Sequence, residues 1–146
     1  MNSDMKVLIN LAGHRSDDAI ATWQNLQQQC QQALAKLALL KEHRERYEDL
    51  LRGGLQRGMS AIATRAYLNF TRQIDDIVHR QQDEVERIEA AVARQWEHVV
   101  ELRREKRVYE ILGERAAAQE LETALRRSQS EIDDLLQRAA SLPRLR

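Results

Sequence analysis

The chain has little of what a compact core or a disulfide framework needs. Its 146 residues include one cysteine, one proline and one phenylalanine, and aromatic residues make up only 4%. A single cysteine cannot form an internal disulfide, which favours a reducing compartment. The lone proline, Pro143, stands near the end, so no proline interrupts helix formation before it. These shortages argue against an ordinary globular domain.

Two further absences limit the classes of function. The 23 basic residues are balanced by 23 acidic ones, so no net charge attracts nucleic acid or a membrane surface. No apolar run approaches the roughly 20 residues of a membrane span. The short apolar stretch over 7–12 lacks the flanks of a secretory signal. We therefore expect a cytoplasmic protein without a nucleic-acid partner.

What the chain does contain is helix-forming sequence in a heptad pattern. Charged residues reach 32%, and apolar residues alternate in steps of four and three from Ala19 to Leu51, except that Arg44 occupies one position of the pattern. This pattern is typical of a helix that packs lengthwise on a second helix. We expect the first helix to end at Arg52. It starts either near Ser3 or at Ser16, an N-cap candidate.

Three of the five glycines lie close together and predict a reversal of the chain. Gly53, Gly54 and Gly58 place a bend over 53–59, because glycine tolerates left-handed backbone and weakens helices. A second helix is expected over about 60–140, either continuous or broken near Gly113. The predicted fold is all-α: a long antiparallel two-helix coiled-coil hairpin with a longer, overhanging second helix.

The second helix carries its own apolar stripe, expected to include Phe70, Trp96 and either Ile77 or Val78. The doubled apolar positions 77 and 78 allow a stutter in the heptad register. With the bend centred near residue 56, Leu37 is expected to face Ile74, and Trp23 to face Ile88. Residues beyond about Tyr109 then have no partner within the chain. Their apolar stripe must fold back, self-associate or bind another protein.

Residue patterns that carry chemistry are scarce. The glycine cluster lacks the ending of a phosphate-binding loop. Asp76 and His79 form one carboxylate–histidine pair, but a di-metal bundle needs two such pairs. Cys30 lies in the heptad stripe, where a small core residue is the ordinary interpretation. We expect no catalytic, cofactor or metal site.

Three segments together resemble the flagellar export protein family FliJ. They are CQQALAKLALL in the first helix, YEDLLRGGLQRGMSAIATRAYLNFTRQIDDIVHRQ over Tyr47–Gln81, and QWEHVVELRREKRVYEILGER over Gln95–Arg115. Their order, spacing and total length are similar to those of the family over nearly the whole chain. The resemblance implies one hairpin domain over residues 1–146.

The resemblance also implies a function. Members of the family are non-enzymatic components of the bacterial flagellar type III export apparatus and act as a central stalk and chaperone escort. The implied partners are a hexameric export ATPase (FliI-like), the cytoplasmic domain of the export gate (FlhA-like) and export chaperones, without a small-molecule substrate. The implied location is the cytoplasm, peripherally associated with the inner membrane.

Matching positions imply a gate-binding surface near the bend, made of Leu40, Tyr47, Phe70, Ile74 and Ile77. Two alternatives to a flagellar stalk stay open at this point. The chain could be the equivalent stalk of a virulence injectisome, or a generic coiled-coil scaffold that dimerises through its overhang.

Overall fold

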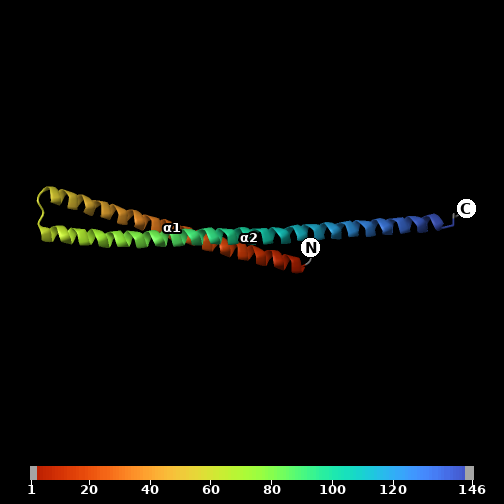
Figure 1. Ribbon diagram of the computed structural model, residues 1–146. Coiled ribbons are helices and arrows are strands. Elements are labelled where there is room, and N and C mark those ends of the chain that lie inside the picture. Colours follow the sequence, from red (N-terminus) through yellow and green to blue (C-terminus); the bar gives the residue numbers. More distant parts are fainter. Residues whose placement is uncertain (1–2, 144–146) are drawn as a thin grey trace. The chain divides into compact units, whose positions relative to one another are not determined.

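The computed structural model describes residues 3–143 and contains two helices over them. Helix α1 spans Ser3–Gln56, helix α2 spans Ala61–Ser141, and a loop over 57–60 joins them (Figure 1). No strand occurs within these described residues. The structure confirms the predicted all-α helical hairpin.

Two compact units make up the chain. One is Asp18–Val100, and the other combines Met1–Asp17 with Glu101–Arg146. The first unit contains the loop and the facing parts of both helices, and it is the hairpin proper. The single-domain organisation over 1–146 stays a prediction.

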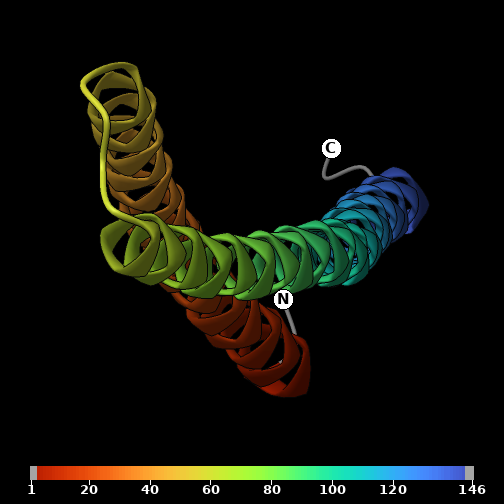
Figure 2. The same cartoon turned by 60° about the vertical axis from the view of Figure 1, so that its left-hand side comes forward.

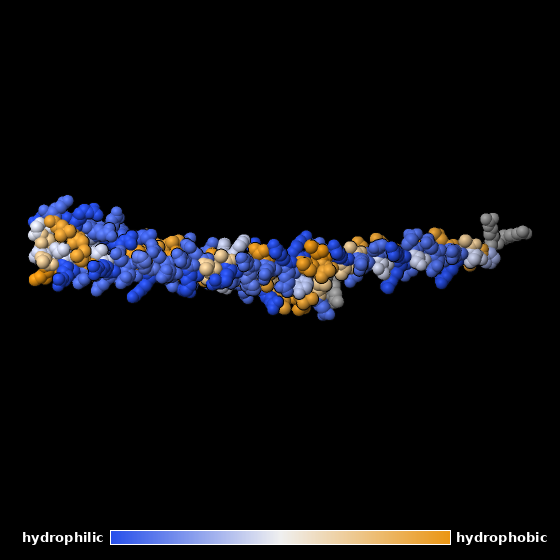
Figure 3. Space-filling view, viewed as in Figure 1, coloured by the Kyte–Doolittle hydropathy of each residue, from blue (hydrophilic) through white to orange (hydrophobic). Residues whose placement is uncertain are grey.

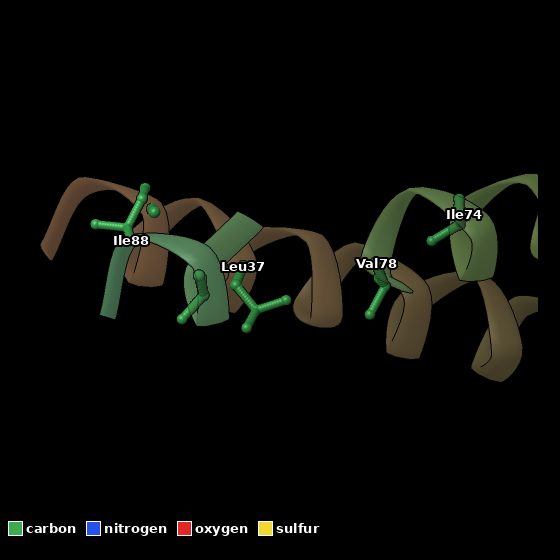
Figure 4. Packing of buried hydrophobic residues seen from close by; sticks show 6 residues of the cluster. Leu37, Ile74, Val78 and Ile88 are labelled. Carbon is green, nitrogen blue, oxygen red and sulfur yellow. The ribbon is translucent and has the colours of Figure 1, made fainter. Parts of the chain in front are cut away.

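The hairpin unit has a narrow core between its two helices. Six buried side chains form one cluster, with Cys30, Leu40, Tyr47 and Val92 packed against it. In Figure 4, Leu37 lies between Ile88 and Val78 along the line where the helices meet. The cluster consists of Ala33, Leu37, Ile74, Val78, Val85 and Ile88. Cys30 is thus a partly buried residue beside this core, as the heptad pattern predicts.

Both helices keep a strict four–three alternation of covered positions, which we call the seam. On α1 the covered positions from Ala19 to Leu51 match the predicted stripe. On α2 the seam takes Val78, which is fully buried, and leaves Ile77 exposed. It also takes Thr71 and Gln95 in place of their larger aromatic neighbours. The predicted stutter is therefore wrong, because polar residues continue the regular heptad where the apolar pattern drifts.

Two seam glutamines bond to the backbone of the opposite helix. Gln81 Nε2 donates to the carbonyl of Ala33, and Gln95 Nε2 donates to the carbonyl of Ala19, both at 3.0 Å. An alanine has no side chain beyond Cβ, so the amide can reach the backbone. These bonds satisfy polar groups that would otherwise be costly to cover. The polar seam residues are thus structural.

The first helix ends in a Schellman motif, which is shorter than the predicted bend. Gly58 adopts φ of 85°, and the amide of Met59 donates to the carbonyl of Gly54 at 3.0 Å. The Met59 side chain occupies the space where a Cβ on Gly54 would lie. Gly53 and Gly54 are helical, so the predicted bend over 53–59 is wrong in its first half. The loop ends at Ser60, whose Oγ accepts from the amide of Ala63 and caps the start of α2.

The longer first helix changes which residues face one another. Trp23 lies against Trp96, with ring centroids 4.8 Å apart, and not against Ile88 as expected. Arg44 on α1 likewise pairs with Asp75 on α2 at 3.6 Å. The prediction placed the reversal near residue 56, whereas the chain reverses over 57–60. Each α1 residue therefore faces an α2 residue that lies later in the sequence than the predicted one.

The second unit pairs the start of α1 with a later stretch of α2. Helix α1 spans Gly13 without a break, which settles the open choice in favour of a start at Ser3. Arg15 reaches Glu105 across this pair at 3.9 Å. Helix α2 also continues through Gly113, which is buried, and its covered positions extend to Ala116. The uncovered part of α2 therefore begins later than the expected position near Tyr109.

Candidate partner-binding surfaces

The tip of the hairpin, defined here as residues 50–72, exposes more apolar surface than the rest of this unit. Figures 1 and 2 both show α1 and α2 separating as they approach the loop, and Figure 3 shows apolar side chains gathered at this end. The exposed apolar side chains of the tip are Leu50, Leu55, Ile62, Leu68 and Phe70. Contiguous apolar patches of this kind usually mark interaction sites.

An aromatic pair lies between the two helices in this region. The rings of Tyr47 and Phe70 have centroids 4.5 Å apart and are inclined at 60°. With Ala66 and Tyr67 they line a shallow cavity of about 250 Å³. A cavity of this size and apolar character accepts one large side chain of a partner. It is open to solvent and holds no reactive group, so it suits recognition.

The structure separates the five sequence-predicted binding residues into two groups. Ile74 is 8% exposed and belongs to the core cluster, and Leu40 and Tyr47 pack against that cluster. Phe70 and Ile77 are 42% and 45% exposed on α2. Periodicity places 70 and 77 one heptad apart and therefore on one side of the helix. Only these two present a large open surface, while Leu40, Tyr47 and Ile74 support it from within the seam.

Sequence reasoning missed the most exposed apolar residue of the tip. Ile62 is 86% exposed, in the first turn of α2. It lies outside the seam pattern, so an a/d reading assigned it no role. An isoleucine in the first turn after an N-cap, without a heptad partner, is the signal that could have identified it.

A second exposed apolar surface follows the last part of α2. We call it the distal stripe, and every member is about half exposed or more: Leu121, Leu125, Ile132, Leu135, Leu136 and Leu142. All residues over 117–143 are exposed. At about 100° per residue, the centre of the stripe is turned by roughly a third of a turn from the seam positions over 109–116. A partner of the stripe must therefore approach from another side of α2 than the start of α1 does.

Charged groups near these surfaces form ordinary exposed pairs. Glu84 accepts from the Arg87 guanidinium at 3.0 Å, and this hydrogen bond lowers the pKa of Glu84 below its usual 4.5. Arg107 of the basic run over 103–107 pairs with Glu110 and Glu114. That run is therefore at least partly neutralised by acids of the same helix.

Residues 3–143 contain neither a metal-binding cluster nor a membrane span. Within them, no group of three or more His, Cys, Asp or Glu side chains is placed to hold a metal ion. Neither helix in this range combines the length and apolar character of a membrane span.

The fold and its exposed surfaces define a coiled-coil hairpin with two exposed apolar regions, a tip and a distal stripe. The family model described as Flagellar FliJ protein matches residues 1–144. The chain therefore belongs to the FliJ family, a family of structural and escort proteins with a role in flagellar protein export. No curated protein and no solved structure matches it.

Proposed function

We propose that this chain is the non-enzymatic central stalk and chaperone escort of the flagellar type III export apparatus. In this role it couples a hexameric export ATPase to the export gate, in the cytoplasm at the inner membrane. The single observation that supports this best is the exposed distal stripe on α2, where every residue over 117–143 is exposed. A helix of this length gains most of its stability from a packed apolar face, so a partner is needed there.

The distal stripe is the proposed contact with the ATPase. Its six apolar side chains are exposed along more than two heptads. Leu125→Asp with Leu135→Asp should weaken binding to the ATPase by about tenfold or more, because each substitution places a charge in an apolar interface. Binding to the gate domain should stay within about twofold. Equal affinities for the ATPase before and after the change would contradict the proposal, as would an equal loss for both partners.

The exposed pair Phe70 and Ile77 is the proposed contact with the cytoplasmic domain of the gate. Phe70→Ala with Ile77→Ala should weaken that complex by about tenfold, since truncated apolar anchors dominate interface energies. Leu34→Ala with Leu39→Ala is the matched control, because both leucines are similarly exposed on α1. If the control weakens gate binding as much as the tip variant does, the assignment to this surface is wrong.

A generic scaffold is the second candidate, favoured by the same exposed stripe. Two copies could cover each other over residues 117–143, which would make a stable dimer. Light scattering on the isolated chain separates the two functions. A monomer that raises the activity of the ring ATPase supports the stalk, and a dimer abolished by Leu125→Asp with Leu135→Asp supports the scaffold.

A further inference from the structure

The tip carries a charge that the neutral composition of the chain conceals. Between Asp49 and Asp75 every charged residue is an arginine, and these are Arg52, Arg57, Arg65 and Arg72. The chain as a whole has 23 basic and 23 acidic residues. A locally unbalanced positive field at one end of a neutral molecule attracts and orients an acidic partner.

Two of these arginines share the outer side of α2 with apolar side chains. The set that we call the outer face consists of Ile62, Arg65, Leu68, Asn69 and Arg72. Two hollows of about 380 and 450 Å³ lie on it, and Ala61, Arg65 and Asn69 line both. The smaller hollow is also lined by Ile62 and Ala66, and the larger one by Thr64, Leu68 and Arg72. Hollows lined by both apolar and guanidinium groups suit side chains of mixed character.

The arginines of the outer face are available to an outside partner. Arg52 pairs with Asp49 on α1, but neither Arg65 nor Arg72 makes an ion pair with any residue over 3–143. Helical periodicity puts positions 65, 69 and 72 opposite the seam residues Thr71 and Ile74. The same periodicity turns Phe70 and Ile77 toward a different flank. The outer face therefore lies on a different side of α2 from the proposed gate contact, and the two adjoin at Ala66.

We propose that the outer face binds an acidic amphipathic helix of a partner protein. Arg65 and Arg72 are one heptad apart, about 10 Å along α2, which matches carboxylates repeated at the same interval on a helix lying alongside. Apolar side chains between those carboxylates would enter the two hollows and cover Leu68 and Ile62. The hollows lie beside these arginines and would receive individual side chains of such a helix. This inference goes beyond the stalk function and does not depend on it.

The test uses the full chain and a synthetic helical peptide of about 20 residues, with two leucines per heptad flanked by glutamates. Titration into isotopically labelled protein should shift the amide signals of residues 61–72. Arg65→Glu with Arg72→Glu should weaken binding by about tenfold or more. The matched control is Arg80→Glu with Arg94→Glu, which reverses two exposed arginines elsewhere on α2. It should change the affinity by no more than about twofold.

Three results would overturn the proposal. One is an equal loss of affinity in both variants, which would indicate attraction by net charge alone. Another is a set of signal shifts over residues 121–142 instead of the tip. The third is binding to vesicles of anionic phospholipid that is lost in Arg65→Glu with Arg72→Glu, while the peptide does not bind. Ile62→Ser adds a variant without a charge change, and we expect it to weaken the peptide complex by about threefold to tenfold.

Discussion

Two parts of α2, Ala61–Val100 near the loop and 117–143 far from it, have similar apolar spacing but opposite environments. Over Ala61–Val100 the heptad positions face α1, and Val78 and Val99 are completely buried. Over 117–143 the helix has leucines at similar spacing, and every one of them is exposed. Local pairs such as Glu122–Arg126 at 2.6 Å support the far part, but each such pair contributes only about 0.2–0.5 kcal/mol. Identical periodicity thus predicts a helix in both places and cannot identify its partner.

The largest expected effect tests this difference directly. Val78→Asp places an unpaired carboxylate in the core, and it should lower the free energy of unfolding by about 3–5 kcal/mol. Leu125→Asp introduces the same charge into the distal stripe. It should change the free energy of unfolding by less than about 0.5 kcal/mol. Chemical denaturation followed by circular dichroism measures both. If the two variants lost similar stability, the distal stripe would be covered in the isolated chain.

A smaller effect is expected from the tryptophan pair in the hairpin. Trp23→Ala removes a ring whose centroid lies 4.8 Å from that of Trp96, and we expect a loss of about 2–3 kcal/mol because both rings are only partly buried. A double-mutant cycle with Trp96→Ala should give a coupling energy of about 0.5–1.5 kcal/mol. Strictly additive losses would show that the rings do not interact in solution.

The loop glycines offer a matched pair of substitutions with opposite signs. Gly58→Ala forces alanine into positive φ and should cost about 1 kcal/mol of stability. Gly53→Ala puts a better helix former at a helical position where nothing lies within 4 Å of the added methyl group. It should stabilise the protein by about 0.5–1 kcal/mol. Thermal unfolding of both variants and of the parent protein measures these changes in stability. A change of the same sign in both variants would refute the Schellman assignment.

The smallest effect concerns pH. The hydrogen bond from Arg87 lowers the pKa of Glu84, so its stabilising contribution is present above the ordinary carboxyl pKa and is lost as pH falls through the lowered value. Carbon NMR titration should find a midpoint for Glu84 below 4.5. Arg87→Ala should move that midpoint back toward the ordinary value. A midpoint that does not respond to this substitution would show that another group holds the carboxylate.

Sequence patterns predicted the two helices and the α1 seam because both follow from local spacing. The four–three alternation identified the seam positions of α1 from Ala19 to Leu51. On α2 the same reasoning preferred Phe70 and Trp96 to Thr71 and Gln95, since hydrophobicity alone ranks aromatic residues higher. In the structure, Gln95 takes the seam position because its amide bonds to a backbone carbonyl of α1, and the bulky ring of Trp96 lies beside the seam.

The binding surfaces were harder to predict than the fold. Burial of Ile74 depends on the register of the two helices, and that register depends on where the loop turns. An error of a few residues at Gly53 and Gly54 displaced the partner of Trp23 from Trp96 to Ile88. Ile62 is exposed because it lies outside the seam on α2, and a pattern that searches for covered positions assigns such a residue no role.

The two glutamine bonds have a consequence for the alignment of the two helices. Ala19 and Ala33 are two heptads apart, and so are Gln81 and Gln95, so both bonds form in one alignment only. Slippage of α1 past α2 by one heptad would break both together and set one amide against the side chain of Leu26. Purely aliphatic coiled coils tolerate such sliding, because every heptad resembles the next. Here the two bonds specify a single alignment of α1 and α2.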